Sequence, residues 1–165
     1  MLDKVTIRPI SEADSPDIQA VALEAWQYTY GTIFEQQFIE DFVNRNYAPA
    51  AIHSLFPQLQ AGTMYFDVAE HESRLIGFCN IGIHGLMAEL YRIYLLPAYI
   101  GQGIGREFLR LGETFLLEHG ISTYFCFVHQ DNEIGKRFYF RSGFQHVPEK
   151  DHDGEWYMEK EISTS

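Results

Sequence analysis

The alternating glycines Gly101, Gly103 and Gly105 form the segment of this chain that is best suited to binding chemistry. They lie between a strand-like run closed by Pro97 and a helical run that ends at Gly120. Glycines let backbone N–H groups approach an anion closely, and a helix N-terminus adds the positive end of its dipole. The loop is therefore typical of a pyrophosphate site, although a tight turn explains the same residues equally well.

The glycine spacing excludes two common phosphate motifs. The third glycine comes one residue too early for the G-x-G-x-x-G dinucleotide fingerprint, and no Lys-Ser or Lys-Thr pair follows, as a P-loop would require. A different assignment is needed if this loop binds phosphate.

A second motif follows in the C-terminal part of the chain, where Asn132, Phe138-Tyr139 and Gly143-Phe144 fit the pattern N-x-x-x-x-x-F-Y-x-x-x-G-F. Together with Leu95-x-Pro97 and the 100–105 loop, these residues resemble the two signatures of the GNAT superfamily of N-acetyltransferases. The resemblance extends from residue 5 to residue 160. It implies an α/β (α+β) fold with a mixed, mostly antiparallel seven-stranded sheet flanked by helices, whose fourth and fifth strands splay apart.

Acetyl-CoA is the cosubstrate that the resemblance implies, with no metal. The residues expected to bind it are Ile93, Leu95, Gly101, Gln102, Gly103, Ile104, Gly105, Arg106, Asn132 and Tyr139. One departure is Ile100, where the family usually has Arg or Gln. Because the family binds pyrophosphate mainly through backbone N–H groups, we expect Ile100 to weaken binding modestly, with Gln102 or Arg106 compensating. Its effect on acyl choice stays open.

Catalytic roles also follow from the resemblance. Tyr139 stands where the family has the general acid that protonates the departing CoA thiolate, and a backbone N–H near Ile93 to Leu95 would stabilise the oxyanion. The alternative for Tyr139 is a packed side chain on an amphipathic helix. Asn132 either contacts the cofactor or only caps its helix.

The base is harder to assign. An alkylamine is protonated at neutral pH, so transfer needs a base or a water relay, and Glu89 at the start of the fourth strand is our candidate. An exposed carboxylate at a strand end is the alternative. Arg92 could contact an anionic substrate group or form an ion pair with Glu89.

The amine acceptor is expected to contact residues of the first helix and of the third and fourth strands. The candidate substrate-binding residues are Trp26, Tyr28, Tyr30, His84 and Arg92. Aromatic rings could hold an alkylammonium group by cation–π attraction. For Trp26, packing in the core explains the residue at least as well.

These residues need a framework of alternating strands and helices. Hydrophobic periodicity and turn residues predict strands at 5–9, 64–69, 75–83, 89–95, 123–128, 145–147 and 156–160, and helices at 16–30, 35–44, 49–59, 104–119 and 133–142. Asp14 or Ser15 should cap the first helix, with Pro16 in its first turn. The pattern predicts a single N-acetyltransferase domain over residues 1–165.

Composition limits the partners. A formal net charge of -11 argues against nucleic acid and would attract a cationic substrate, although solubility alone also explains it. We expect no membrane partner, because the N-terminal residues carry charges and no long apolar run follows. The two cysteines fit a reducing cytoplasm. The oligomeric state stays open between a monomer and a homodimer.

A second cluster of polar residues could be read as metal ligands. His146, Asp151, His152 and Asp153 lie close together near the C-terminus, but a polar hairpin turn explains them without a metal. We therefore predict no metal site.

The sequence thus predicts transfer of acetyl from acetyl-CoA to the primary amine of a small polyamine-like molecule or of a peptide or protein. The negative charge favours a polycation. One alternative is a CoA-binding sensor or regulatory module without turnover, which would not need Tyr139. A protein–protein scaffold is a third, and it predicts no dependence of stability on CoA.

Overall fold

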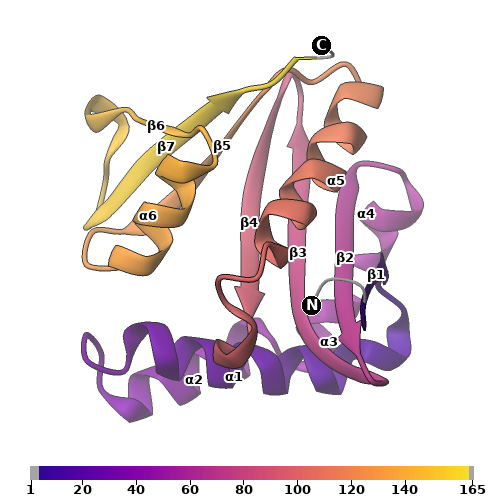
Figure 1. Cartoon of the computed structure of the whole chain (residues 1–165), viewed down its shortest axis with the longest axis vertical. Coiled ribbons are helices and arrows are strands. Elements are labelled where there is room, and N and C mark those ends of the chain that lie inside the picture. Colours follow the sequence, from indigo (N-terminus) through magenta and orange to yellow (C-terminus); the bar gives the residue numbers. More distant parts are fainter. Residues whose placement is uncertain (1–3, 164–165) are drawn as a thin grey trace.

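The computed structural model of the protein describes residues 4–163 (Figure 1). Strands and helices follow one another in the predicted order. They are β1 (Val5–Pro9), η2 (Glu12–Asp14), α1 (Ser15–Tyr30), α2 (Gln36–Asn46), α3 (Pro49–His53), α4 (Phe56–Gln60), β2 (Met64–His71), β3 (Arg74–His84), β4 (Met87–Leu95), η3 (Pro97–Tyr99), α5 (Ile104–Glu118), β5 (Thr123–His129), α6 (Glu133–Arg141), β6 (Gln145–His146), η4 (Pro148–Lys150) and β7 (Glu155–Glu161).

One sheet connects all seven strands in the order β1-β2-β3-β4-β5-β7-β6. Neighbouring strands are antiparallel except β4 and β5, which run parallel and pair only at Ala88 with Tyr124 and Glu89 with Phe125. Beyond these residues the two strands diverge, so the sheet opens into a V between them (Figure 1). The expected fold class and the splayed fourth and fifth strands are confirmed.

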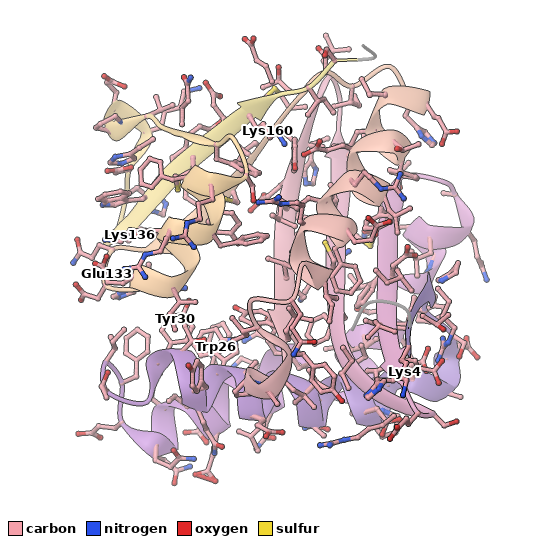
Figure 2. All side chains as sticks on the ribbon, viewed as in Figure 1. Lys4, Trp26, Tyr30, Glu133, Lys136 and Lys160 are labelled. Carbon is pink, nitrogen blue, oxygen red and sulfur yellow. The ribbon has the colours of Figure 1, made fainter. Side chains whose placement is uncertain are left out.

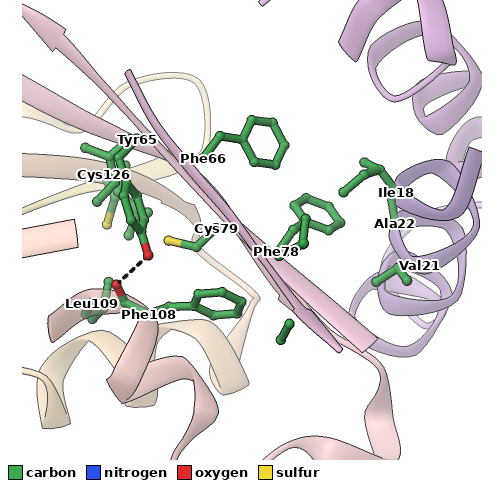
Figure 3. Packing of buried hydrophobic residues seen from close by; sticks show 14 of the residues in the cluster. Ile18, Val21, Ala22, Tyr65, Phe66, Phe78, Cys79, Phe108, Leu109 and Cys126 are labelled. Carbon is green, nitrogen blue, oxygen red and sulfur yellow. Dashed lines mark hydrogen bonds between the residues drawn. The ribbon is translucent and has the colours of Figure 1, made fainter. Parts of the chain in front are cut away.

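Helices cover both faces of the sheet. α1 packs on β3 and β4, with α2 and α3 against it, while α5 packs on β2, β3 and β4 from the other side. The fully buried ring of Phe78 points toward Ile18 and Ala22 of α1, whereas Phe108 of α5 lies across the sheet (Figure 3). Burying one such aromatic side chain contributes about 2–3 kcal/mol. The two layers thereby fix α1 and α5 against the strands that border the V.

A β-bulge interrupts the pairing of β3 with β4. Asn80 pairs with Arg92 and Ile81 with Leu90, so Tyr91 is the extra residue. A bulge re-aims the side chains that follow it, and bulges are common next to functional sites. Here it turns Tyr91 toward the opening between β4 and β5.

Two local expectations differ from the structure. The helix expected over 49–59 is divided into α3 and α4, because Pro57 has no N–H to bond the His53 carbonyl and the intervening Leu55 N–H bonds Ile52 in a tighter turn. Asp14 precedes α1, but its carboxylate makes no capping bond there and instead binds Arg8 at 2.8 Å and the Ser11 N–H at 2.7 Å. Among the described residues, no helix is long and apolar enough to cross a membrane.

Candidate active site

The V between β4 and β5 contains a cleft of about 650 Å³. Its walls come from the end of α1, from β4, from the loop before α5, from β5 and from α6. Residues 90–95 of β4 have no partner strand on the cleft side, so their backbone groups are free to bind a ligand. The predicted residues that line the cleft are Tyr28, Tyr30, Ile93, Leu95, Gly101, Gly103, Gly105, Arg106, Asn132 and Tyr139.

The glycine loop presents backbone N–H groups to this cleft. Gly101 and Gly103 have φ values of 84° and 86°, in the left-handed region that favours glycine, and Gly103 directly precedes α5. In the part of the chain that the structure describes, the amides of residues 101–106 donate no backbone hydrogen bond. Six unpaired donors at a helix N-terminus suit a pyrophosphate group.

The side chains of two predicted members of the loop do not line the cleft. The Gln102 amide nitrogen donates to the Ala98 carbonyl oxygen at 3.1 Å, so its side chain braces the loop. Ile104 is fully buried in the core. Neither side chain lines the cleft, so a cofactor contact by either residue would be made by its N–H group.

Three arginines lie around the same opening. Arg106 lies in the first turn of α5, and Arg137 and Arg141 lie one turn apart on α6. None of them has a carboxylate oxygen within 4.0 Å among residues 4–163, although the chain as a whole is strongly acidic. Unpaired guanidinium groups beside free amides favour a polyanionic ligand. Arg137 and Arg141 were not among the predicted residues, although their four-residue spacing on the helix that Asn132 caps places them on one face.

Tyr139 lies on α6 and faces the cleft. Its ring packs edge-on against Phe138 and Phe144, with centroids 5.5 and 5.3 Å away. Burial raises the pKa of the Tyr139 hydroxyl, which therefore keeps its proton at neutral pH. Within the described residues this hydroxyl makes no hydrogen bond, so it is available to a ligand.

Asn132 joins α6 to α1 across the cleft. Its side-chain oxygen accepts a hydrogen bond from the Gly135 N–H at 2.8 Å, and its side-chain nitrogen donates to the Tyr30 hydroxyl at 3.2 Å. The first bond caps α6, and the second connects residues that are 102 positions apart. Burial raises the pKa of Tyr30 to about 12, so this hydroxyl also stays neutral. Figure 2 shows Tyr30 and Trp26 projecting from α1 toward the opening.

The aromatic acceptor residues separate into two groups. Tyr28, which is 56% exposed, lines the cleft together with Tyr91 and Phe127. Trp26 does not line it: the ring is 8% exposed and stacks on Phe42 at 4.2 Å. Trp26 thus lies in the core and packs against the ring of Tyr30, with centroids 4.3 Å apart. Tyr91 gave no sequence signal, because its orientation depends on the bulge.

Glu89, His84 and Arg92 lie beside the cleft without lining it. Half-burial raises the pKa of Glu89, the charge of Glu155 adds to this, and His84 opposes it. His84 forms a hydrogen bond with the hydroxyl of Tyr91. Arg92 makes no ion pair with Glu89: it donates to the Asn80 side-chain oxygen at 2.6 Å and lies over the Tyr47 ring.

The C-terminal polar cluster forms a hairpin contact. The His146 ring nitrogen lies 2.9 Å from the Asp151 carboxylate, which also accepts the Tyr157 N–H. Among residues 4–163, no group of three or more His, Cys, Asp or Glu side chains is arranged to hold a metal ion.

Known proteins are similar to this chain in sequence and in fold. The profile of the acetyltransferase (GNAT) family matches residues 21–144. The chain is 32% identical over 162 residues to the spermidine N(1)-acetyltransferase of Thermoplasma acidophilum, covering 97% of this chain and 99% of that protein. The chain belongs to the acetyltransferase (GNAT) family. An uncharacterized N-acetyltransferase of Bacillus subtilis is 31% identical over 133 residues, which cover 78% of this chain and 73% of that protein.

A solved GNAT structure superposes closely on the whole chain. The PaiA N-acetyltransferase of Thermoplasma acidophilum, crystallised in complex with coenzyme A, gives a TM-score of 0.91 at 30% identity and covers 96% of this chain and 99% of its own. The expected family and enzyme class are confirmed: this GNAT protein is an acetyl-CoA-dependent N-acetyltransferase. The roles of its individual residues stay predictions.

Proposed function

We propose that this protein acetylates a primary amine of a polyamine-like molecule, with acetyl-CoA bound in the cleft between β4 and β5. The observation that carries the proposal is the free amides of residues 101–106 opposite Tyr139, on the two walls of one cleft. The acceptor class is supported by the spermidine N(1)-acetyltransferase to which the chain is similar over its length, and by the net charge of -11.

Each group of residues has a separate role in the proposed reaction. The 101–106 amides and the three arginines hold the phosphates, and the free edge of β4 at residues 90–95 binds the pantetheine arm. A β4 N–H group near Ile93 stabilises the oxyanion, and Tyr139 donates its proton to the departing thiolate. Glu89 removes a proton from the bound ammonium, directly or through a water molecule, and the neutral amine then attacks the thioester carbonyl.

The proposed function is tested by measuring free CoA release from acetyl-CoA with polyamines, amino acids, aminoglycosides and short peptides. Thermal shift with acetyl-CoA is recorded in parallel. We expect turnover with spermidine or a related polyamine and an acetyl-CoA-dependent rise in melting temperature. Turnover only with peptides would replace the acceptor class, and a thermal shift without any turnover would favour the CoA-binding sensor. No thermal shift would refute the cleft assignment.

We expect Arg106→Ala to raise the apparent acetyl-CoA constant about fivefold and to leave kcat nearly unchanged. The change removes one charge-assisted contact to phosphate, worth about 1 kcal/mol when the site is partly exposed. Initial rates at varied acetyl-CoA measure both constants. Arg110→Ala is the matched control, because Arg110 lies one turn further along α5 and pairs with Glu107 away from the cleft. Equal constants for parent and Arg106→Ala would refute this role.

We expect Glu89→Gln to lower kcat/KM for the amine about tenfold near pH 7, because the acceptor then has no positioned base. The deficit should shrink toward about pH 10, where alkylamines arrive neutral. In the parent protein the rate should rise with pH through the ionisation of Glu89, whose pKa burial places above its ordinary value. A deficit that is constant across pH would show that Glu89 is no base.

A further inference from the structure

One face of β4, β5 and β7 combines aromatic rings with carboxylates. Paired positions in the sheet share a face, and the register places Glu89 beside Phe125, Phe125 beside Glu159, Phe127 beside Tyr157, and His129 beside Glu155. We call this surface the acidic aromatic face; its members are Glu89, Phe125, Phe127, Glu155, Tyr157 and Glu159. The alternate residues of β7 point the other way, toward α5 and α6: Lys160 pairs with Glu113, and Trp156 packs on Lys136.

The acidic aromatic face adjoins the part of the cleft that Tyr91 and Phe127 line. Phe127 lines the cleft and is 36% exposed. Glu155 pairs in register with His129, whose ring lies 6.2 Å from the ring of Tyr30 in the cleft. Glu155 therefore lies near the α1 side of the cleft, although it is far from Tyr30 along the chain. Burial raises the pKa of both Glu89 and Tyr30, and the charge of Glu155 adds to each shift.

The carboxylates of this face lack cationic partners. Glu89, Glu155 and Glu159 are half-buried, yet among the described residues no Lys, Arg or His nitrogen lies within 4.0 Å of any of them. Half-buried carboxylates without counterions are costly and attract cations. Arg106, Arg137 and Arg141, which line the cleft, likewise have no carboxylate oxygen within 4.0 Å in the part of the chain that the structure describes. Unpaired positive charge therefore lines the cleft itself, and unpaired negative charge lies on the face beside it.

The rings of this face already hold an ammonium group. Lys150 Nζ lies 4.9 Å from the centre of the Tyr157 ring, and Phe125 stacks on that ring at 5.0 Å. An alkylammonium over an aromatic ring is attracted by the ring quadrupole, and more strongly where water is partly excluded. The Tyr157 ring is thus already occupied, and Phe127, which lines the cleft, is the exposed ring of this face.

We propose that the acidic aromatic face binds the non-reacting part of a polycationic acceptor, and that Glu155 pairs with an ammonium group distant from the reacting amine. The inference rests on the proposed function and extends it. Glu89 adjoins the reacting nitrogen, the exposed Phe127 ring lies along the methylene chain, and Glu155 binds the distal charge. Such a site distinguishes polyamines from monoamines by their second charge.

The test compares two acceptors that share a primary aminobutyl end, spermidine with additional ammonium groups and butylamine without them. Kinetic constants are measured for the parent protein, Glu155→Gln and Glu118→Gln. Glu118 is the matched control, because it is exposed at the end of α5 on the opposite side of the sheet. We expect Glu155→Gln to raise KM for spermidine about fivefold, while kcat and the constants for butylamine stay unchanged.

Each other outcome overturns a defined part of the inference. Equal spermidine constants for the parent and Glu155→Gln would refute the role of Glu155 and leave the proposed function intact. A parallel loss with butylamine would indicate a structural role. If Glu155→Gln changed the molecular mass in analytical ultracentrifugation without changing KM, the face would be a contact with a second copy. Absence of spermidine turnover by the parent protein would instead refute the polyamine acceptor itself.

Discussion

Tyr139→Phe should lower kcat about a hundredfold, the smallest effect usual for loss of a general acid, and leave acetyl-CoA affinity within about twofold. The change removes only the hydroxyl, so the packing of the ring against Phe138 and Phe144 is kept. Without a proton donor the CoA sulfur must leave as an anion in a partly dry cleft. Steady-state release of CoA measures kcat, and isothermal titration with acetyl-CoA measures affinity.

The pH dependence gives a second check on Tyr139. Because burial raises the pKa of its hydroxyl, the parent protein should keep its activity on the alkaline side up to about pH 10, the ordinary pKa of tyrosine. Tyr99→Phe is the control, since Tyr99 bonds His71 at 2.7 Å and lies outside the cleft lining. An unchanged kcat in Tyr139→Phe would show that thiolate departure needs no acid here, and a CoA-binding sensor would then regain support.

Gly103→Val should weaken acetyl-CoA binding about 5- to 30-fold, because a left-handed backbone costs a residue with a side chain about 1–2 kcal/mol. Gly103 has φ 86° and lines the cleft directly before α5. Valine favours another backbone conformation of the loop, so the N–H groups of residues 101–106 no longer point toward one ligand. Titration with acetyl-CoA measures the affinity, and kcat at saturating acetyl-CoA should change much less.

Gly120→Val separates the loop geometry from general strain. Gly120 has φ 76° and follows the C-terminal end of α5, far from the glycine loop along that helix. A Cβ added at Gly120 would meet no atom within 4 Å. Both substitutions should lower the melting temperature similarly, since each strains one left-handed position. Only Gly103→Val should change acetyl-CoA affinity. Equal affinities in the two variants would mean that the backbone of this loop does not bind the phosphates.

The two chemical motifs could be read from the sequence because each depends on neighbours along the chain. Alternating glycines before an apolar helix define the loop. The Asn132-to-Phe144 spacing places Phe138 and Tyr139 on the helix that Asn132 caps. The same local rules predicted the order of strands and helices. They failed at residues 49–59, where Pro57 divides an otherwise helical pattern.

Contacts between segments that are distant in the chain could not be predicted from the sequence. Nothing local indicates that Asn132 bonds Tyr30, that Arg137 and Arg141 of α6 line the same cleft as Arg106, or that Glu155 pairs with His129 beside Tyr30. Each depends on strand register and on how far β4 and β5 diverge. A pattern of period two also cannot locate the bulge that turns Tyr91 into the cleft.

The sequence by itself therefore determined the chemistry that this chain can offer: a glycine loop for phosphate, a tyrosine on α6 and an excess of negative charge. Local geometry fixes such features, because turns and helix faces are set by residues a few positions apart. The tertiary structure alone decided where these charges lie, since three arginines line the cleft between β4 and β5 while the unpaired carboxylates lie on the neighbouring face of β4, β5 and β7. That arrangement arises from packing across the sheet, which couples residues far apart in the chain.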